Sequence, residues 1–297
     1  MTLRITQGMT SSIVLGDIQS AAERLSKLQQ KLSSGKELEK PSDNPFAVSR
    51  GLQLRSDLEM NRQFQRNAMD ANDWHAVTDT TLAHINDLVL RARDLIVQGA
   101  NDTMGPAGRQ AIVAEFTQLV ESVKSEANTK VAGRFIFAGS ATLTQPYTVG
   151  GADTYAGNTD AMRREIGPGV QIDLNVTGIA AIGDDTSGLL KAMRDAITNL
   201  NTGNTVALQT TDLQAISNAA EGVTNLRAVV GARQMRLETA TARLQEIEQT
   251  QNDLLSRTED ADMAKTYVDF STQQAVYQAA LKAGSQVIQP SLLDFLR

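Results

Sequence analysis

One heptad repeat decides the fold of this chain, and it is clearest in Ile216-Ser-Asn-Ala-Ala-Glu-Gly-Val-Thr-Asn-Leu-Arg-Ala-Val-Val230. Its first position is apolar every time and is filled by Ile216, Val223, Val230, Leu237 and Leu244. Its companion positions are filled by Ala219, Leu226, Arg233, Ala240, Ile247 and Leu254. A repeat sustained beyond three or four heptads is typical of a long coiled-coil helix. Arg233 is the polar exception, and such a residue can fix the register of packed helices at some cost in stability.

The two ends of the chain carry further apolar stripes with similar spacing. The first stripe contains Val14, Ile18, Ala21, Leu25, Leu28 and Leu32. The second contains Met263, Tyr267, Phe270, Tyr277, Leu281 and Ile288. Each stripe is too narrow to form a core alone, so each helix requires a partner. We expect the first and last helices to pair with each other.

The last residues indicate assembly with other subunits. Ser291-Leu-Leu-Asp-Phe-Leu-Arg297 places large apolar side chains at a chain end, where another subunit would have to cover them. The expected assembly interface consists of Val14, Ile18, Leu25, Leu28, Leu32, Tyr277, Leu281, Ile288, Leu292, Phe295 and Leu296. The alternative that the residues leave open is a self-contained helical bundle with a frayed tail.

The middle of the chain has a different character. Ten of the 21 glycines lie between residues 133 and 188. Phe135-Ile-Phe137 is typical of a buried strand, and Val170-Gln-Ile-Asp-Leu-Asn-Val176 alternates like a half-buried one, with 161–166 as its partner across the Gly167-Pro-Gly169 turn. The predicted fold is therefore mainly α with a small β insert. We expect an elongated rod of long antiparallel coiled-coil-like helices, with the N- and C-terminal helices paired and a central β-rich domain.

Three regions follow from these patterns. Residues 1–45 and 255–297 form the predicted terminal coiled-coil assembly region, 46–132 and 187–254 a helical rod domain, and 133–186 a small β-rich outer domain. The loop that follows the first helix contains Pro41, Asp43, Asn44 and Pro45. Pro45 suits the first position of the next helix, and Asp43 or Asn44 suits its N-cap.

Composition excludes several classes of function. The chain has no cysteine, which removes thiolate catalysis and thiolate metal sites, and its net charge of −6 argues against nucleic-acid binding. No apolar run is long enough to span a membrane, and the first residues lack the apolar core of a cleavable signal peptide. His75 and His84 are poorly spaced for a shared metal, and Glu259, Asp260 and Asp262 suit a helix start. We therefore expect no enzyme activity, metal or cofactor.

Several short motifs carry a family resemblance. Leu32-Ser-Ser-Gly-Lys36, Pro41-Ser-Asp-Asn-Pro45, Ser256-Arg-Thr-Glu-Asp-Ala-Asp-Met263 and Gln289-Pro-Ser-Leu-Leu-Asp-Phe-Leu296 resemble the terminal signatures of the bacterial flagellin superfamily. Within it, the flanking prolines, Gly133-Arg-Phe-Ile-Phe-Ala-Gly139 and Thr144-Gln-Pro-Tyr147 are most similar to the hook-associated protein 3 branch, the FlgL-type junction proteins.

The resemblance implies a structural component of the bacterial flagellum, at the adaptor zone between hook and filament on which flagellin polymerises. The implied partners are further copies of the chain in a ring, the other hook-associated junction protein, flagellin, and an export chaperone on the C-terminal segment. The implied location is extracellular, reached through flagellar type III export without a cleavable signal peptide. The alternatives are flagellin itself, as a filament subunit, and an intracellular coiled-coil scaffold.

Overall fold

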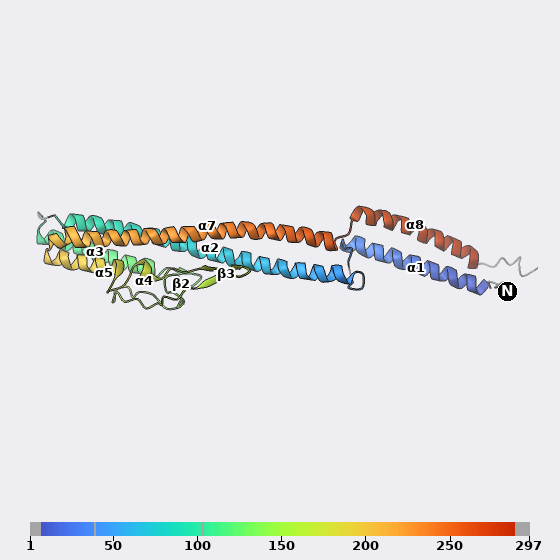
Figure 1. Cartoon of the computed structure of the whole chain (residues 1–297), viewed down its shortest axis with the longest axis horizontal. Coiled ribbons are helices and arrows are strands. Elements are labelled where there is room, and N and C mark those ends of the chain that lie inside the picture. The colour runs from blue at the N-terminus through green and yellow to red at the C-terminus, as the bar shows by residue number, and fades with distance from the viewer. Residues whose placement is uncertain (1–6, 39, 102–103, 289–297) are drawn as a thin grey trace, which may run out of the picture. The chain divides into compact units, whose positions relative to one another are not determined.

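The computed structural model describes residues 7–38, 40–101 and 104–288, and helices dominate it (Figure 1). Contacts divide the chain into two units: unit 1 comprises residues 1–59 and 248–297, and unit 2 comprises residues 60–247. Two long helices, α2 (Pro45–Gly99) and α7 (Leu213–Glu259), contribute to both units. The predicted fold class, mainly helical with a small central β region, is confirmed.

Unit 1 is built around an antiparallel pair of helices, α1 (Gln7–Ser34) and α8 (Met263–Ile288), which lie side by side in Figure 1. The Gln273 side-chain amide donates to the carbonyl of Ala21 at 3.3 Å. A Cβ added to Gly284 would lie 2.9 Å from Cδ1 of Ile18, so the two helices approach closely there. The N- and C-terminal helices are thus paired, as the stripes predict.

The two helices face each other through stripes of different composition. On α1 the predicted stripe is partly or fully buried at Val14, Ile18, Ala21, Leu25, Leu28 and Leu32. On α8 the partly or fully buried positions are Thr266, Phe270, Gln273, Tyr277, Ala280 and Gly284. The predicted α8 stripe therefore differs from the observed one, because Met263, Tyr267 and Leu281 are exposed. Phe270 and Tyr277 face the contact as predicted, whereas Thr266, Gln273, Ala280 and Gly284 occupy the rest of it.

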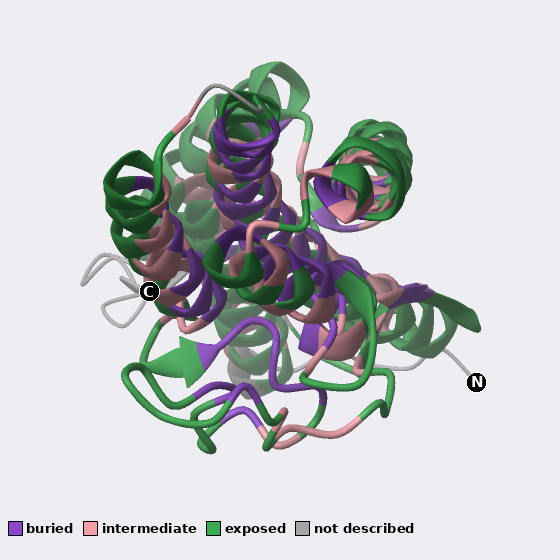
Figure 2. Ribbon diagram, turned by 90° about the vertical axis from the view of Figure 1, so that its left-hand side faces the viewer, coloured by how far each residue is buried: buried purple, intermediate pink, exposed green. Residues whose placement is uncertain are grey.

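Unit 2 contains the closed hydrophobic core. Helices α2 and α7 run antiparallel: the Asn61 side chain donates to the Leu244 carbonyl at 2.9 Å, and Arg227 pairs with Asp79 at 3.0 Å. Ile216, Val223, Val230 and Leu237 of the heptad repeat are fully buried. They join a cluster with residues of α2, α3 (Pro106–Ala127) and α5 (Gly188–Thr202). Figure 2 shows the buried residues on the facing sides of these helices.

Short elements complete unit 2. Helix α4 (Gly178–Ala181) precedes α5, whereas α6 (Thr205–Ala207) and a π-helical turn η1 (Leu208–Asp212) lead into α7. Two antiparallel hairpins form the β region. They pair β1 (Lys130–Val131) with β2 (Arg134–Phe135), and β3 (Arg163–Gly167) with β4 (Val170–Asp173).

The strands are shorter than the sequence predicts. Strand β2 ends at Phe135, although Ile136 and Phe137 are fully buried. The carbonyl of Phe137 accepts hydrogen bonds from the Gly178 amide and the Tyr155 hydroxyl, each at 2.8 Å. Loop groups therefore take the bond that a neighbouring strand would have supplied.

Arg233 interrupts the heptad repeat because it contacts the β region. Its guanidinium donates to the Asn175 carbonyl at 3.2 Å and lies 3.6 Å from the Asp173 carboxylate. A buried lysine has a comparable role: Lys124 is fully buried and pairs with Glu121 and Asp153 at 3.0 Å each. These polar contacts join the helices of unit 2 to the β region.

Replacing Leu237 with alanine should destabilise unit 2 by about 2–5 kcal/mol, because the substitution leaves a cavity in a fully buried site. The matched control is Met235→Ala, since Met235 is 71% exposed on the same helix and should change stability by about 0.5 kcal/mol or less. Chemical denaturation followed by circular dichroism measures both. Equal effects of the two substitutions would contradict the assigned heptad register.

Candidate assembly interface

The site begins at the connection between α1 and α2. Gly35 ends α1 with φ +70°, and its amide donates to the Lys31 carbonyl at 2.9 Å, as in a left-handed helix cap. Helix α2 starts at Pro45, and the Asn44 side chain accepts from the Ala47 amide at 3.1 Å. Asn44 is therefore the N-cap, while the Asp43 carboxylate accepts from the backbone amide of Lys40 at 3.0 Å.

The α1–α2 and α7–α8 connections are joined by backbone hydrogen bonds. The amide of Glu37 donates to the Glu259 carbonyl at 2.7 Å, and the amide of Ala261 donates to the Gly35 carbonyl at 2.9 Å. Lys36 and Asp260 form the antiparallel bridge between these two bonds. The end of α1 and the start of α8 are thus held together at one point.

Glu259 reinforces this point with a buried carboxylate. The carboxylate accepts from Lys36 at 2.8 Å and from Arg55 at 2.5 Å. Burial raises the pKa of this carboxyl, but the hydrogen bonds from Lys36 and Arg55 outweigh burial and hold the pKa below its ordinary value. Gly51 makes the approach possible, because a Cβ there would overlap the carboxylate.

The sequence did not reveal the role of Glu259. Capping was the expected role for the whole acidic cluster, but only Asp262 performs it, by accepting from the Lys265 amide at 3.1 Å at the start of α8. Glu259 is the last residue of α7, and its partners Lys36 and Arg55 lie more than 200 residues away in the chain. No local pattern signals contacts of that range.

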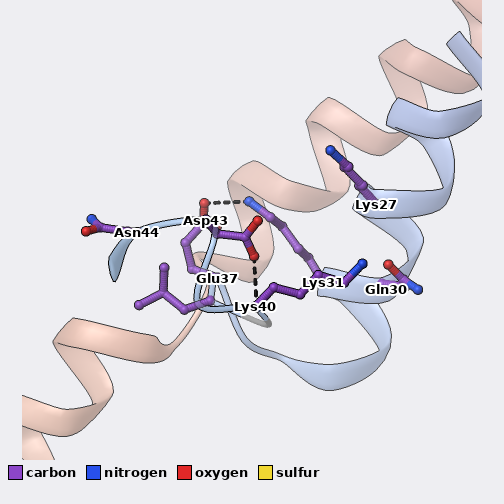
Figure 3. Close-up of a pocket in the computed structure, with 8 residues that line it drawn as sticks. Lys27, Gln30, Lys31, Glu37, Lys40, Asp43 and Asn44 are labelled. Carbon is purple, nitrogen blue, oxygen red and sulfur yellow. Dashed lines mark hydrogen bonds and ion pairs between the residues drawn. The ribbon is translucent and has the colours of Figure 1, made fainter. Parts of the chain in front are cut away.

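A pocket of about 390 Å³ lies beside the same connection (Figure 3). Its lining includes Lys27, Lys31, Lys40, Glu37 and Asp43. Lys31 pairs with Glu37 at 2.5 Å, a contact drawn as a dashed line in Figure 3. Because acidic and basic groups are mixed around it, the pocket favours neither an anionic nor a cationic ligand.

Large apolar side chains are exposed on α1 and α8. They are Met9, Ile13 and Leu15 on α1, and Met263, Tyr267, Val268, Val276 and Leu281 on α8. Only Lys265, Asp269 and Lys282 are charged among the 26 residues of α8. Large apolar side chains on more than one face of a helix are normally buried against a partner. The faces of α8 that point away from α1 can therefore serve as a protein interface.

The structure places the predicted interface residues differently. Val14, Ile18, Leu25, Leu28 and Leu32 lie on the partly buried stripe of α1, and Tyr277 lies on that of α8. Leu281 is exposed instead. Ile288 is the last residue of α8, while Leu292, Phe295 and Leu296 lie outside the described residues.

The two histidines are far from forming a joint site. His75 is fully buried in unit 2, and burial followed by the nearby charge of Arg233 lowers its pKa to about 4. His84 is exposed, 3.6 Å from Glu126. Among the described residues, His, Asp and Glu side chains form no cluster that could hold a metal ion. Within the same residues, every helix is too short or too polar to cross a bilayer.

Two family models match this architecture. The bacterial flagellin N-terminal helical region matches residues 5–142, and the bacterial flagellin C-terminal helical region matches residues 213–296. Together they cover well over half of the chain, including both members of the terminal helix pair. The chain belongs to the bacterial flagellin family. It is a structural component of the flagellum.

Individual relatives extend over nearly the whole length. Flagellar hook-associated protein 3 of Escherichia coli is 27% identical over 94% of each chain. Flagellin FlaB2 of Treponema pallidum is 28% identical over 90% of this chain and 91% of its own. The structure of Bacillus cereus FlgL is 25% identical, with a TM-score of 0.59, and the match covers 70% of this chain and 99% of that one.

The Glu259 contacts predict a local response to acid. Because the folded-state pKa is depressed, the stabilisation is present above the ordinary value of about 4.5 and is lost as pH falls below it. Glu259→Gln should increase hydrogen exchange at the amides of Glu37 and Ala261 by about tenfold at neutral pH. It should also remove the acid response, after correction for intrinsic exchange rates.

Asp260→Asn is the control for this experiment, because Asp260 lies 3.7 Å from Lys36 but remains exposed. Its effect on the two amides should be small. Exchange that is equally fast in both variants would show that the buried carboxylate does not hold the connection.

Proposed function

We propose that this chain is a hook-associated junction protein that forms the adaptor between hook and filament on which flagellin polymerises. The observation that carries the proposal is the composition of α8. This helix has only three charged residues among 26, so most of its surface can be buried between subunits. The full-length similarity to E. coli hook-associated protein 3 and the likeness to B. cereus FlgL support the junction role.

The proposed interface retains the residues derived from the sequence and adds the outward face of α8. Val14, Ile18, Leu25, Leu28, Leu32 and Tyr277 would hold the helix pair together. Leu281, together with Met263 and Tyr267, would contact neighbouring subunits, and Ile288, Leu292, Phe295 and Leu296 would extend that surface. Under this proposal, 1–45 and 255–297 act as the assembly region, 46–132 and 187–254 as the supporting helices, and 133–186 as the outer domain.

The proposed partners are further copies in a ring, the other hook-associated junction protein and flagellin. Flagellar type III export would deliver the chain to the outside, with a chaperone on its C-terminal segment. Because the ordering of terminal helices costs conformational entropy, burial in the assembly would supply the compensating free energy. The proposed role is purely structural, without catalysis.

Leu281→Asp should abolish incorporation into flagella, because it places a charge on a surface that must be buried between subunits. The control is Met235→Asp, which replaces an equally apolar but 71% exposed residue of unit 2. Both variants should keep the wild-type circular dichroism. Sheared flagella and culture medium are then assayed for the protein, and the Leu281 variant should appear only in the medium. Normal incorporation of that variant would contradict the proposed interface.

Flagellin is the competing assignment, because FlaB2 of T. pallidum is as similar as the hook-associated relative. A strain that lacks this chain but retains flagellin separates the two roles. A junction protein predicts that unpolymerised flagellin is released and that no filaments grow. Filaments that persist in this strain would favour the filament-subunit role.

A further inference from the structure

The start of α2 carries a solvent-exposed aromatic side chain. Phe46 is 77% exposed, in a chain with only seven phenylalanines. Asn44 caps α2 two residues earlier and Pro45 begins the helix, so the position of Phe46 is held by regular structure. Exposed aromatic residues on rigid elements are frequent anchors of protein interfaces.

A pocket that suits such a side chain lies on the same few turns of α2. Its volume is about 140 Å³, and its apolar lining is Leu38, Pro41, Val48 and Leu52. A cavity of about 150 Å³ can hold benzene, so the volume is sufficient for a phenyl ring even though polar side chains contribute much of the lining. Lys40, Arg55 and Glu259 complete the lining, so a guanidinium is available to contact the face of an aromatic ring.

The aromatic residue and the pocket lie on opposite sides of α2. At 3.6 residues per turn, Val48, Leu52 and Arg55 are rotated by about 200°, 240° and 180° from Phe46. Phe46 therefore points away from the pocket of its own subunit. Along the axis, Phe46 is less than two turns from the apolar lining of the pocket on α2, because Val48 and Leu52 follow it by two and six residues.

This arrangement fits a head-to-tail contact between copies. In a ring, one face of each subunit meets the opposite face of the next at nearly the same height. We propose that Phe46 of one subunit inserts into the pocket lined by Leu38, Pro41, Val48 and Leu52 of the neighbouring subunit. This inference rests on the proposed assembly into a ring, and it identifies one contact that closes it.

The pocket is continuous with the region that orders the terminal helices. Glu259, which lines it, is held by Lys36 and Arg55, and the same carboxylate lies against Gly51. An inserted ring would contact this ion-pair cluster directly. The lateral contact and the pairing of α1 with α8 would therefore stabilise each other.

Cysteine crosslinking tests the contact, and the absence of native cysteine makes the readout specific. Flagella that carry the double variant Arg50→Cys/Lys40→Cys are treated with a short bismaleimide, which bridges two nearby thiols. Arg50 is exposed on the same side of α2 as Phe46, and Lys40 is an exposed residue of the pocket lining, so Phe46 and Leu52 both stay in place. The expected product is a ladder of dimers, trimers and larger species. Neither single variant should give a ladder, because a head-to-tail contact never brings two copies of one residue together.

Arg50→Cys/Gln53→Cys is the matched control. Gln53 is exposed and adjacent to Leu52 in sequence, but it lies on the same side of α2 as Phe46. A ladder from this control, or dimers from Arg50→Cys alone, would overturn the proposed geometry. The same conclusion follows if the Lys40 double variant assembles into flagella without crosslinking. If wild-type protein is absent from flagella, the proposed function fails instead.

Alanine substitution gives an independent measurement that needs no crosslinker. Phe46→Ala should reduce the protein retained in sheared flagella by about tenfold and increase it in the medium, because an interface anchor is lost. Ser49→Ala changes another exposed residue of the same helix and should leave retention unchanged. Retention of Phe46→Ala at the wild-type level, with circular dichroism also unchanged, would overturn the contact.

Discussion

A narrow apolar stripe makes each long helix of this protein dependent on a neighbour. In unit 2 the chain itself meets that need, because Val223, Val230 and Leu237 of α7 are buried in one cluster with residues of α2, α3, α5 and the β region. In unit 1, α8 pairs with α1, and several of its large apolar side chains remain exposed. The same requirement therefore produces a closed core in one unit and an open surface in the other.

The terminal pair depends on the point where α1 ends and α8 begins. An isolated pair of this kind has little to fix its register, since small residues of α8 such as Ala280 and Gly284 offer few side-chain atoms to interlock with α1. The two backbone bonds between residues 35–37 and 259–261 define the starting point. A buried carboxylate is costly unless it is paired, so Glu259 restricts the connection to the arrangement in which both Lys36 and Arg55 reach it.

Helices and their stripes could be predicted from the sequence because periodicity is a local signal. The register of α8 could not, for a physical reason: the helix is apolar on several sides, so large side chains such as Met263 and Leu281 suggest one face while close packing selects another. The observed contact needs Gly284, whose missing Cβ lets Ile18 approach. Glu259 was missed because its partners are remote in sequence, whereas the cap at Asn44 follows from four adjacent residues.

Each exposed apolar side chain of α8 can make only a small contact with another subunit, and this affects how the protein assembles. Its exposed large residues, such as Tyr267 and Leu281, are separated by Gln, Ser and Ala, so no compact patch forms that would join two free subunits strongly. In a ring each subunit is contacted from more than one direction, and contacts made after the first become intramolecular with a high effective concentration. A surface of this kind favours growth at an existing end over association in solution. That preference is what an adaptor between two structures requires.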